Sequence, residues 1–187
     1  MLRQRGLTLI ELIVFIVLVA VAFGALVLSM NQFLLHSADP LLRKQALAIA
    51  ESLLEEVQLM PFTFCDPDDA NASIATNSIV GDPNGCATLT EDAPIGPNAG
   101  ESRGHAVTPF DNVSDYHGYA TGPIVDISGT AVGGLANYSA SITVTQTALG
   151  GIAATESLRI VVTVTPPSGD NVVLEGYRTR YAPRTSQ

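Results

Sequence analysis

The sequence predicts an α+β fold in which a long N-terminal helix precedes an antiparallel β-sheet. Three observations support this fold class. Residues 7–30 are almost continuously apolar, residues 40–59 repeat apolar side chains at intervals of three and four, and segments after residue 137 alternate apolar with polar residues. A sheet with one apolar face needs a cover, which the second helix supplies.

Composition narrows the functional classes before any motif is considered. The chain has 187 residues, with nine Lys and Arg against eighteen Asp and Glu, which gives a net charge of −9. This acidic balance argues against nucleic-acid binding, because affinity for phosphates depends on clustered basic side chains. Hydrophobic residues make up 47%, which argues against a disordered chain.

The apolar segment from Leu7 to Met30 contains a single charged residue, Glu11. As a helix of 24 residues it would span about 36 Å, enough to cross a hydrocarbon core of about 30 Å with some tilt. Arg3 and Arg5 precede it, so the positive-inside rule predicts a cytoplasmic N-terminus and a translocated remainder. A cleaved secretory signal is disfavoured, because its apolar region would be about 7–15 residues long.

Glu11 is unusual for a simple anchor. A carboxylate costs roughly 2.5–3.5 kcal/mol at the centre of a bilayer-spanning helix, and less near an end. Two interpretations are open from this residue alone: its side chain reaches the headgroups near the cytoplasmic end, or it has a task beyond anchoring.

Residues 5–12, Arg-Gly-Leu-Thr-Leu-Ile-Glu-Leu, resemble the type IV prepilin signature, in which Glu is the fifth residue after a cleaved Gly. The resemblance implies that a membrane prepilin peptidase cuts between Gly6 and Leu7 and methylates the new amino group of Leu7. Leu7 departs from the Phe or Met usual at this place. A carboxylate among packed apolar helices needs a positive partner, and the resemblance implies that Glu11 pairs with the Leu7 amine of a neighbouring subunit during assembly.

Residues 39–56 and 61–70 narrow the resemblance to the MshD-type minor pilins of the mannose-sensitive haemagglutinin (MSHA) pilus system. This implies a minor subunit that acts in pilus assembly, priming or adhesion, located in the bacterial inner membrane with a periplasmic head and later in the cell-surface pilus. The implied partners are other pilins through the N-terminal helix, the prepilin peptidase, the inner-membrane assembly platform and the lipid bilayer, without nucleic acid or cofactor. The expected regions are a leader over 1–6, a transmembrane and filament-core helix over 7–38, an amphipathic helix over 39–60 and a β-rich head over 61–187.

Three other functions are considered beside this one. A type II secretion pseudopilin is the nearest rival, and a single-pass anchored extracytoplasmic binding domain is a rival from another class. An anchored hydrolase is the third, but neither G-x-S-x-G nor H-E-x-x-H is present, so no catalytic residue and no enzyme activity are predicted. His105 and His117, with Asp111 and Asp115 nearby in sequence, are interpreted as ordinary loop residues.

The remaining elements follow from local patterns. Asp39 as N-cap and Pro40 at the first helical position predict that a second helix begins there and runs to about Leu59. One face of this helix is expected to be apolar and to comprise Leu42, Ala46, Ile49, Leu53 and Val57. Strands are predicted over 138–147, 157–165 and 172–181, with a turn over 166–171 and one further strand over 122–127 in an otherwise loop-rich region.

Cys65 and Cys86 are predicted to form a disulfide, because both lie on the translocated side, where the compartment is oxidising. Two separate thiols are the alternative. The bond would stabilise the loop region by roughly 3 kcal/mol.

An oxygen-rich cluster follows Cys65 and comprises Asp66, Asp68, Asp69 and Asn71. Calcium binds six to eight oxygens from such loops, so these four residues are a weak Ca²⁺ candidate. Their spacing does not match an EF-hand, since Ala70 and Asn71 stand where a ligand and a Gly belong. The alternative is an exposed, turn-forming acidic loop without metal.

Overall fold

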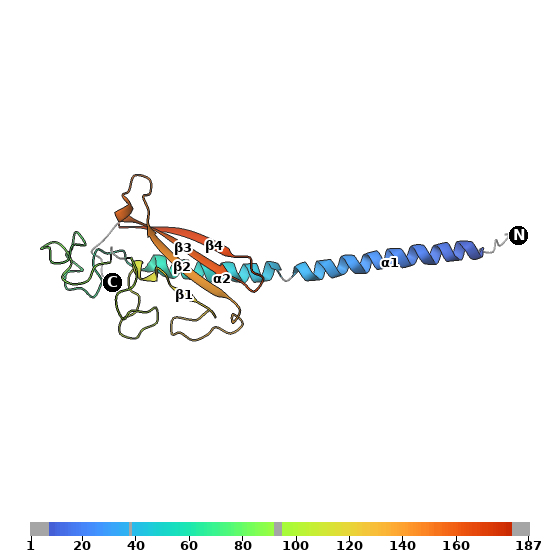
Figure 1. The fold of residues 1–187 in the computed structure, drawn as a ribbon, viewed down its shortest axis with the longest axis horizontal. Helices are drawn as coiled ribbons and strands as arrows, with labels where there is room; N and C mark the ends of the chain where they lie inside the picture. The colour runs from blue at the N-terminus through green and yellow to red at the C-terminus, as the bar shows by residue number, and fades with distance from the viewer. Residues whose placement is uncertain (1–7, 38, 92–94, 181–187) are drawn as a thin grey trace. The chain divides into compact units, whose positions relative to one another are not determined.

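The structure is a computed structural model that describes residues 8–37, 39–91 and 95–180 (Figure 1). The chain divides into two compact units, residues 1–41 and 42–187.

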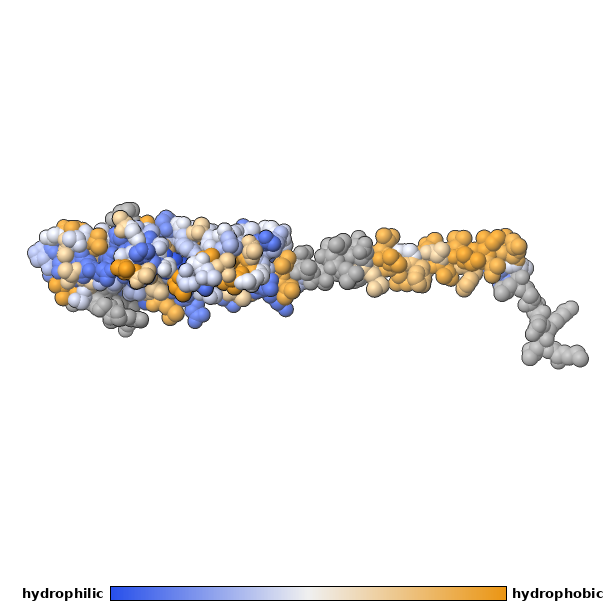
Figure 2. Space-filling model, turned by 90° about the horizontal axis from the view of Figure 1, so that it is seen from below, coloured by the Kyte–Doolittle hydropathy of each residue, from blue (hydrophilic) through white to orange (hydrophobic). Residues whose placement is uncertain are grey.

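The first unit is dominated by α1, which spans Leu9–Ser37. The helix begins where the carbonyl of Thr8 accepts hydrogen bonds from the amides of Glu11 and Leu12, at 3.1 and 3.2 Å. Within it, Leu9–Met30 has a mean hydropathy of 3.1, and none of its residues is buried by the rest of the chain. Figure 2 shows this span as an almost continuous hydrophobic surface. A helix that is apolar on every side needs a membrane or other helices around it.

The second helix, α2, spans Asp39–Leu59, as the cap and proline at its start predict. Its predicted apolar face is confirmed, with Ala46, Leu53 and Val57 buried. The predicted break lies around Ala38, which is outside the described residues.

The head contains a four-stranded antiparallel sheet with the strand order β1-β2-β3-β4. Its strands are β1 (Ala120–Thr121), β2 (Ser139–Gln146), β3 (Ser157–Thr165) and β4 (Val172–Thr179). The register pairs Ile142 with Val162 and Val162 with Leu174, so alternate side chains meet on one face. This confirms the α+β fold, and the three longer strands lie within two residues of their predicted bounds.

The strand predicted over 122–127 is wrong. The edge strand β1 ends at Thr121, and Val125 forms only an isolated bridge with Ala131. Pro123 has no amide hydrogen to donate to a sheet. Asp126 then closes a turn, because its Oδ1 accepts hydrogen bonds from the amides of Ser128 and Thr130, both at 2.9 Å.

The core lies between α2 and one face of the sheet (Figure 1). The buried side chains of this face are Ala140, Ile142, Val144, Leu158, Ile160, Val162 and Val164. At Gly176 in β4 the helix approaches so closely that a Cβ atom would overlap Gln58 and contact Leu54. Two short 3₁₀ helices complete the head, η1 over Ser114–Tyr116 and η2 over Ala154–Glu156.

Candidate functional site

Glu11 lies in the first turn of α1, surrounded along the helix by exposed apolar side chains such as Leu9 and Ile10. It is the only charged residue of the span Leu9–Met30. The predicted cut between Gly6 and Leu7 lies outside the described residues.

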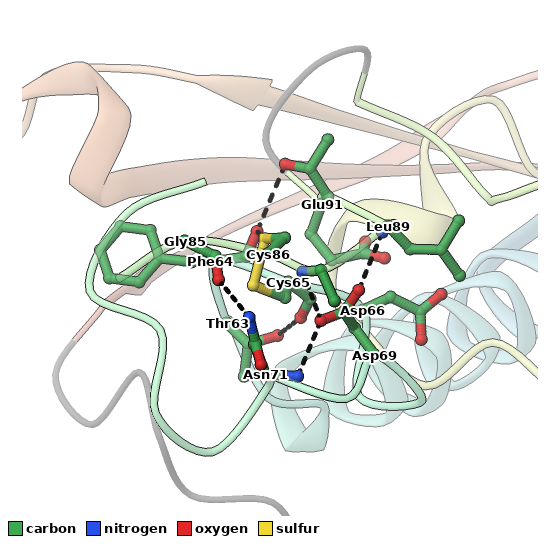
Figure 3. Close-up of a disulfide and its surroundings, with 12 residues drawn as sticks. Thr63, Phe64, Cys65, Asp66, Asp69, Asn71, Gly85, Cys86, Leu89 and Glu91 are labelled. Atoms are coloured by element: carbon green, nitrogen blue, oxygen red, sulfur yellow. Dashed lines mark hydrogen bonds between the residues drawn. A yellow bond between two sulfur atoms is a disulfide. The ribbon is translucent and has the colours of Figure 1, made fainter. Parts of the chain in front are cut away.

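The second notable feature is the disulfide loop, residues 65–86, which is closed by the predicted bond between Cys65 and Cys86 (Figure 3). The two Cα atoms are 5.4 Å apart, and both residues are fully buried. Cys65 also forms an isolated antiparallel bridge with Thr90, so covalent and backbone contacts join the same two segments.

Replacing both Cys65 and Cys86 with Ser should lower the free energy of unfolding by about 3 kcal/mol, because the loop then gains conformational freedom in the unfolded chain. Denaturant unfolding of the full chain in detergent micelles measures this loss. Reduction of the wild-type protein is the control and should give the same loss, whereas an unchanged midpoint in both cases would contradict the prediction.

Asp69 connects the two sides of the disulfide loop (Figure 3). Its buried carboxylate accepts hydrogen bonds from the amides of Asn71, Ala87, Thr88 and Leu89, at 2.7 to 2.9 Å, and from the Thr88 hydroxyl at 3.1 Å. Burial by itself raises the pKa of Asp69, but the backbone amides together outweigh it and hold the pKa well below its ordinary value. Asp69 is therefore a structural acceptor within the loop.

The structure does not gather the four predicted calcium ligands into one group. Asp69 is occupied by the loop amides, and the side-chain amide of Asn71 donates to the carbonyl of Gly85 at 3.0 Å. Asp66 and Asp68 instead lie beside Asp111, with carboxylate oxygens from all three within 4.8 Å of one another.

Three more acids adjoin this group, and we call all six the acid cluster. Its members are Asp66, Asp68, Glu91, Glu101, Asp111 and Asp115. The side-chain amide of Asn98 joins two of them, since it donates to Asp66 at 2.9 Å and to Glu91 at 3.0 Å. Asp66, Glu91 and Asp115 are buried.

The electrostatics of the acid cluster follow from burial and mutual repulsion. Burial, followed by the charge of Asp115, raises the pKa of Glu91 to about 9. Burial is also the largest cause that raises the pKa values of Asp111 and Glu101, each to about 7. The ordinary charged state of these acids is therefore disfavoured.

Sequence reasoning missed Glu91, Glu101 and the role of Asp111 and Asp115. The sequence feature that could have indicated the acid cluster is the stretch between Gln45 and Ser102, which has ten acids and neither Lys nor Arg. His105 and His117 make their hydrogen bonds elsewhere than with the acids. His105 accepts a hydrogen bond from the amide of Thr108, and His117 accepts one from Val144 in β2.

Comparison with known proteins bears on the N-terminal segment. A family model described as the prokaryotic N-terminal methylation motif matches residues 1–27, which include Gly6, Leu7 and Glu11. This match supports a type IV pilin-like protein. No curated protein and no solved structure matches the chain.

The motif implies processing by prepilin peptidase and pilin-type assembly. Together with the apolar span of α1, it indicates anchoring in a membrane. Pilins and pseudopilins both carry this motif. The match therefore supports a structural subunit and does not distinguish between these two classes.

Two arginines attach the loop region of the head to its helix and sheet. Arg103 makes a two-pronged ion pair with Glu56 of α2, with both nitrogen–oxygen distances at 2.7 Å. Arg180, directly after β4, stacks against the rings of Phe62 and Phe64, 4.0 Å from each centroid. The Arg180 contacts hold the chain just before the disulfide loop beside the end of β4, and the Arg103 pair holds a later loop segment against α2.

Proposed function

We propose that this chain is a minor type IV pilin of the MSHA type, cut between Gly6 and Leu7, methylated on Leu7 and assembled through its N-terminal helix. The observation that carries the proposal is the single acid, Glu11, five residues after Gly6 in an otherwise apolar and exposed helix. The methylation motif over residues 1–27 supports the processing step.

The chemistry of the cut explains why the acid is placed there. Removal of residues 1–6 takes away Arg3 and Arg5 and creates an ammonium group on Leu7. In a filament core of packed apolar helices, this ammonium and Glu11 of a neighbouring subunit are the opposite charges available for pairing. Because a buried charge is stable only when it is paired, the ion pair sets the axial stagger between subunits.

The proposed course has two stages. The chain is first held in the bacterial inner membrane by α1, with a cytoplasmic N-terminus and a periplasmic head, where it meets the prepilin peptidase and the pilus assembly platform. It then joins other pilins in a cell-surface pilus as an assembly, priming or adhesive subunit. The resemblance of residues 39–56 and 61–70 to MshD-type pilins supports the minor role.

Intact-mass and N-terminal analysis, with and without prepilin peptidase, tests this function. With the peptidase, we expect the chain to begin at Leu7 and to carry one added methyl group. A type II secretion pseudopilin would be processed in the same way. A strain that carries the chain is therefore also assayed for pili and for type II secretion, which distinguishes a pilin from a pseudopilin. A single-pass anchored binding domain would retain Met1 to Gly6 under both conditions and would overturn the proposal.

The variant Gly6→Lys should keep its leader, because a long charged side chain then occupies the cut site. Mass analysis of the membrane fraction is expected to give a chain that begins at Met1 and lacks the methyl group. Gly133→Lys is the matched control, since a side chain at Gly133 meets open space in the head. Normal processing of Gly6→Lys would refute the cut site.

A further inference from the structure

A groove of about 470 Å³ lies in the head, between α2 and the loop over residues 124–135. Ala48 and Ser52 belong to its α2 wall. Ile127 and Val132 belong to its loop wall, and 58% and 39% of their surfaces are exposed. An apolar groove whose mouth holds exposed apolar side chains is a surface that a partner can cover.

Two charged residues of the groove, Arg103 and Glu56, are already paired within the chain. Besides its two-pronged ion pair with Glu56, Arg103 donates from Nη1 to the carbonyls of Val125 and Asp126, at 3.2 and 3.3 Å. Glu56 also accepts a hydrogen bond from the hydroxyl of Tyr116 at 2.9 Å. Because these groups are occupied, the groove suits an apolar side chain and not a charged ligand.

Unpaired acids stand next to the groove on the exposed side of α2. Glu51 and Glu55 are one helical turn apart, and both are exposed. No basic residue lies three or four positions from either of them, and no ion pair in the described part of the chain includes them. Like charges at this spacing repel along a helix, so a basic side chain from outside the chain would stabilise them.

The same helix carries the complementary group two turns earlier. Lys44 is exposed, has no acid three or four positions away, and takes part in none of the ion pairs of the described residues. Leu47, one turn after Lys44, is also exposed. At 3.6 residues per turn, Arg43 and Leu47 lie on one flank of the exposed side of α2, and Ala48 and Ser52 lie on the opposite flank. Two parallel copies can therefore meet flank to flank.

We propose that a second copy of this chain docks on this surface, with its Leu47 in the groove and its Lys44 beside Glu51. The inference rests on the proposed function, because it takes the copies to run parallel, as the subunits of a filament do. Lys44 and Glu51 are seven residues apart, so the second copy is displaced by about 10 Å along α2. The same displacement brings its Leu47 level with residue 54, within residues 48–56 of α2, which border the groove.

The docked copies use two different surfaces of the chain, so each copy keeps one surface open for the next. Heterologous contacts of this kind build open filaments unless their rotation closes a ring. Because each chain has a net charge of −9, copies in other alignments repel each other, and the pairing of Lys44 with Glu51 selects the register.

Exchange of the two charges tests the pairing. Lys44→Glu should lower the share of the chain in sheared filaments, relative to membranes, about tenfold, because two acids then face each other. Adding Glu51→Lys to Lys44→Glu should restore this share to within about twofold of the wild type. Adding Asp170→Lys instead is the matched control: it restores the net charge equally, but Asp170 lies on the exposed β3–β4 turn, so the share should stay low. Normal incorporation of Lys44→Glu, rescue by neither change or equal rescue by both would overturn the pairing.

Cross-linking identifies the occupant of the groove. Two differently tagged versions of the full chain are made in the same cells, one with Leu47→Cys and the other with Ser52→Cys, and a short bis-maleimide is added. The native cysteines do not react, because they are buried and joined to each other. We expect a dimer that carries both tags, and none when Thr143→Cys, exposed on β2, replaces Ser52→Cys. A product that joins Ser52→Cys only to another protein would overturn the second copy as the occupant.

N-terminal analysis of the same samples separates this contact from the proposed function. A chain that keeps Met1 to Gly6 would overturn the proposed function and the contact together. A chain that begins at Leu7 but gives no dimer with both tags would overturn the contact alone.

Discussion

Glu11→Ala is expected to leave the chain inserted in the membrane and to remove it almost completely from filaments. Insertion should be unaffected, because the change takes the only charge out of the apolar span. Assembly should fail because the Leu7 ammonium of the neighbouring subunit then lies unpaired among apolar helices. Breaking one partner of a buried ion pair costs about 3–5 kcal/mol, which corresponds to a loss of incorporation of about 100-fold or more.

The measurement is the ratio of the variant in sheared filaments to the variant in membranes, by quantitative immunoblot. Leu12→Ala is the matched control, since it shortens the adjacent exposed side chain of α1 without changing charge. Glu11→Gln should behave like Glu11→Ala, because an amide has the shape of the carboxylate but not its charge. Normal incorporation of both Glu11 variants would contradict the ion pair.

The helices and the three long strands were predictable because their signals are local. The apolar face of α2 repeats within one element, and in β2 alternation of side chains places Ile142 and Val144 inward without knowledge of any other strand. The disulfide was equally accessible, since the chain has only two cysteines to pair. In each case the prediction needs only a few neighbouring residues or the number of cysteines in the chain.

The acid cluster was not predictable because it depends on contacts far apart in sequence. Asp66 and Asp68 were candidate ligands, but their third partner is Asp111, and nothing in the spacing connects it to them. Asp69 was assigned to the same candidate set because Asp suits both metals and backbone amides. The two roles can be distinguished only in the folded chain, where the amides of residues 87–89 donate hydrogen bonds to the Asp69 carboxylate.

Asp69→Ala is expected to lower the free energy of unfolding by about 3 kcal/mol or more. The change removes the acceptor for four backbone amides and one hydroxyl, and each donor left buried without a partner costs about 1–3 kcal/mol. Water reaches part of this loop, which reduces the sum. Asp126→Ala is the matched control: Asp126 also accepts backbone amides, but it is exposed, so water replaces it and the loss should be much smaller.

The pH dependence of the stability lost in Asp69→Ala tests whether the charge of Asp69 is the source of that loss. The folded pKa of Asp69 lies below the unfolded value of 3.8, so its contribution is complete above pH 3.8 and is lost as the pH falls further. The acid cluster has the opposite pH dependence. Its contribution to stability falls as the pH rises, and it does so over a higher pH range. The pKa of Glu91 rises from 4.5 to about 9, so its contribution is complete below pH 4.5 and declines towards pH 9.

Because the two pH ranges do not overlap, unfolding measured from pH 2.5 to 9 separates the two contributions. The difference between wild type and Asp69→Ala should be constant above about pH 4 and should shrink below it, whereas both proteins should lose stability in parallel as the pH rises through the window of Glu91. A difference that stayed constant down to pH 2.5 would mean that Asp69 acts through packing and not through its charge.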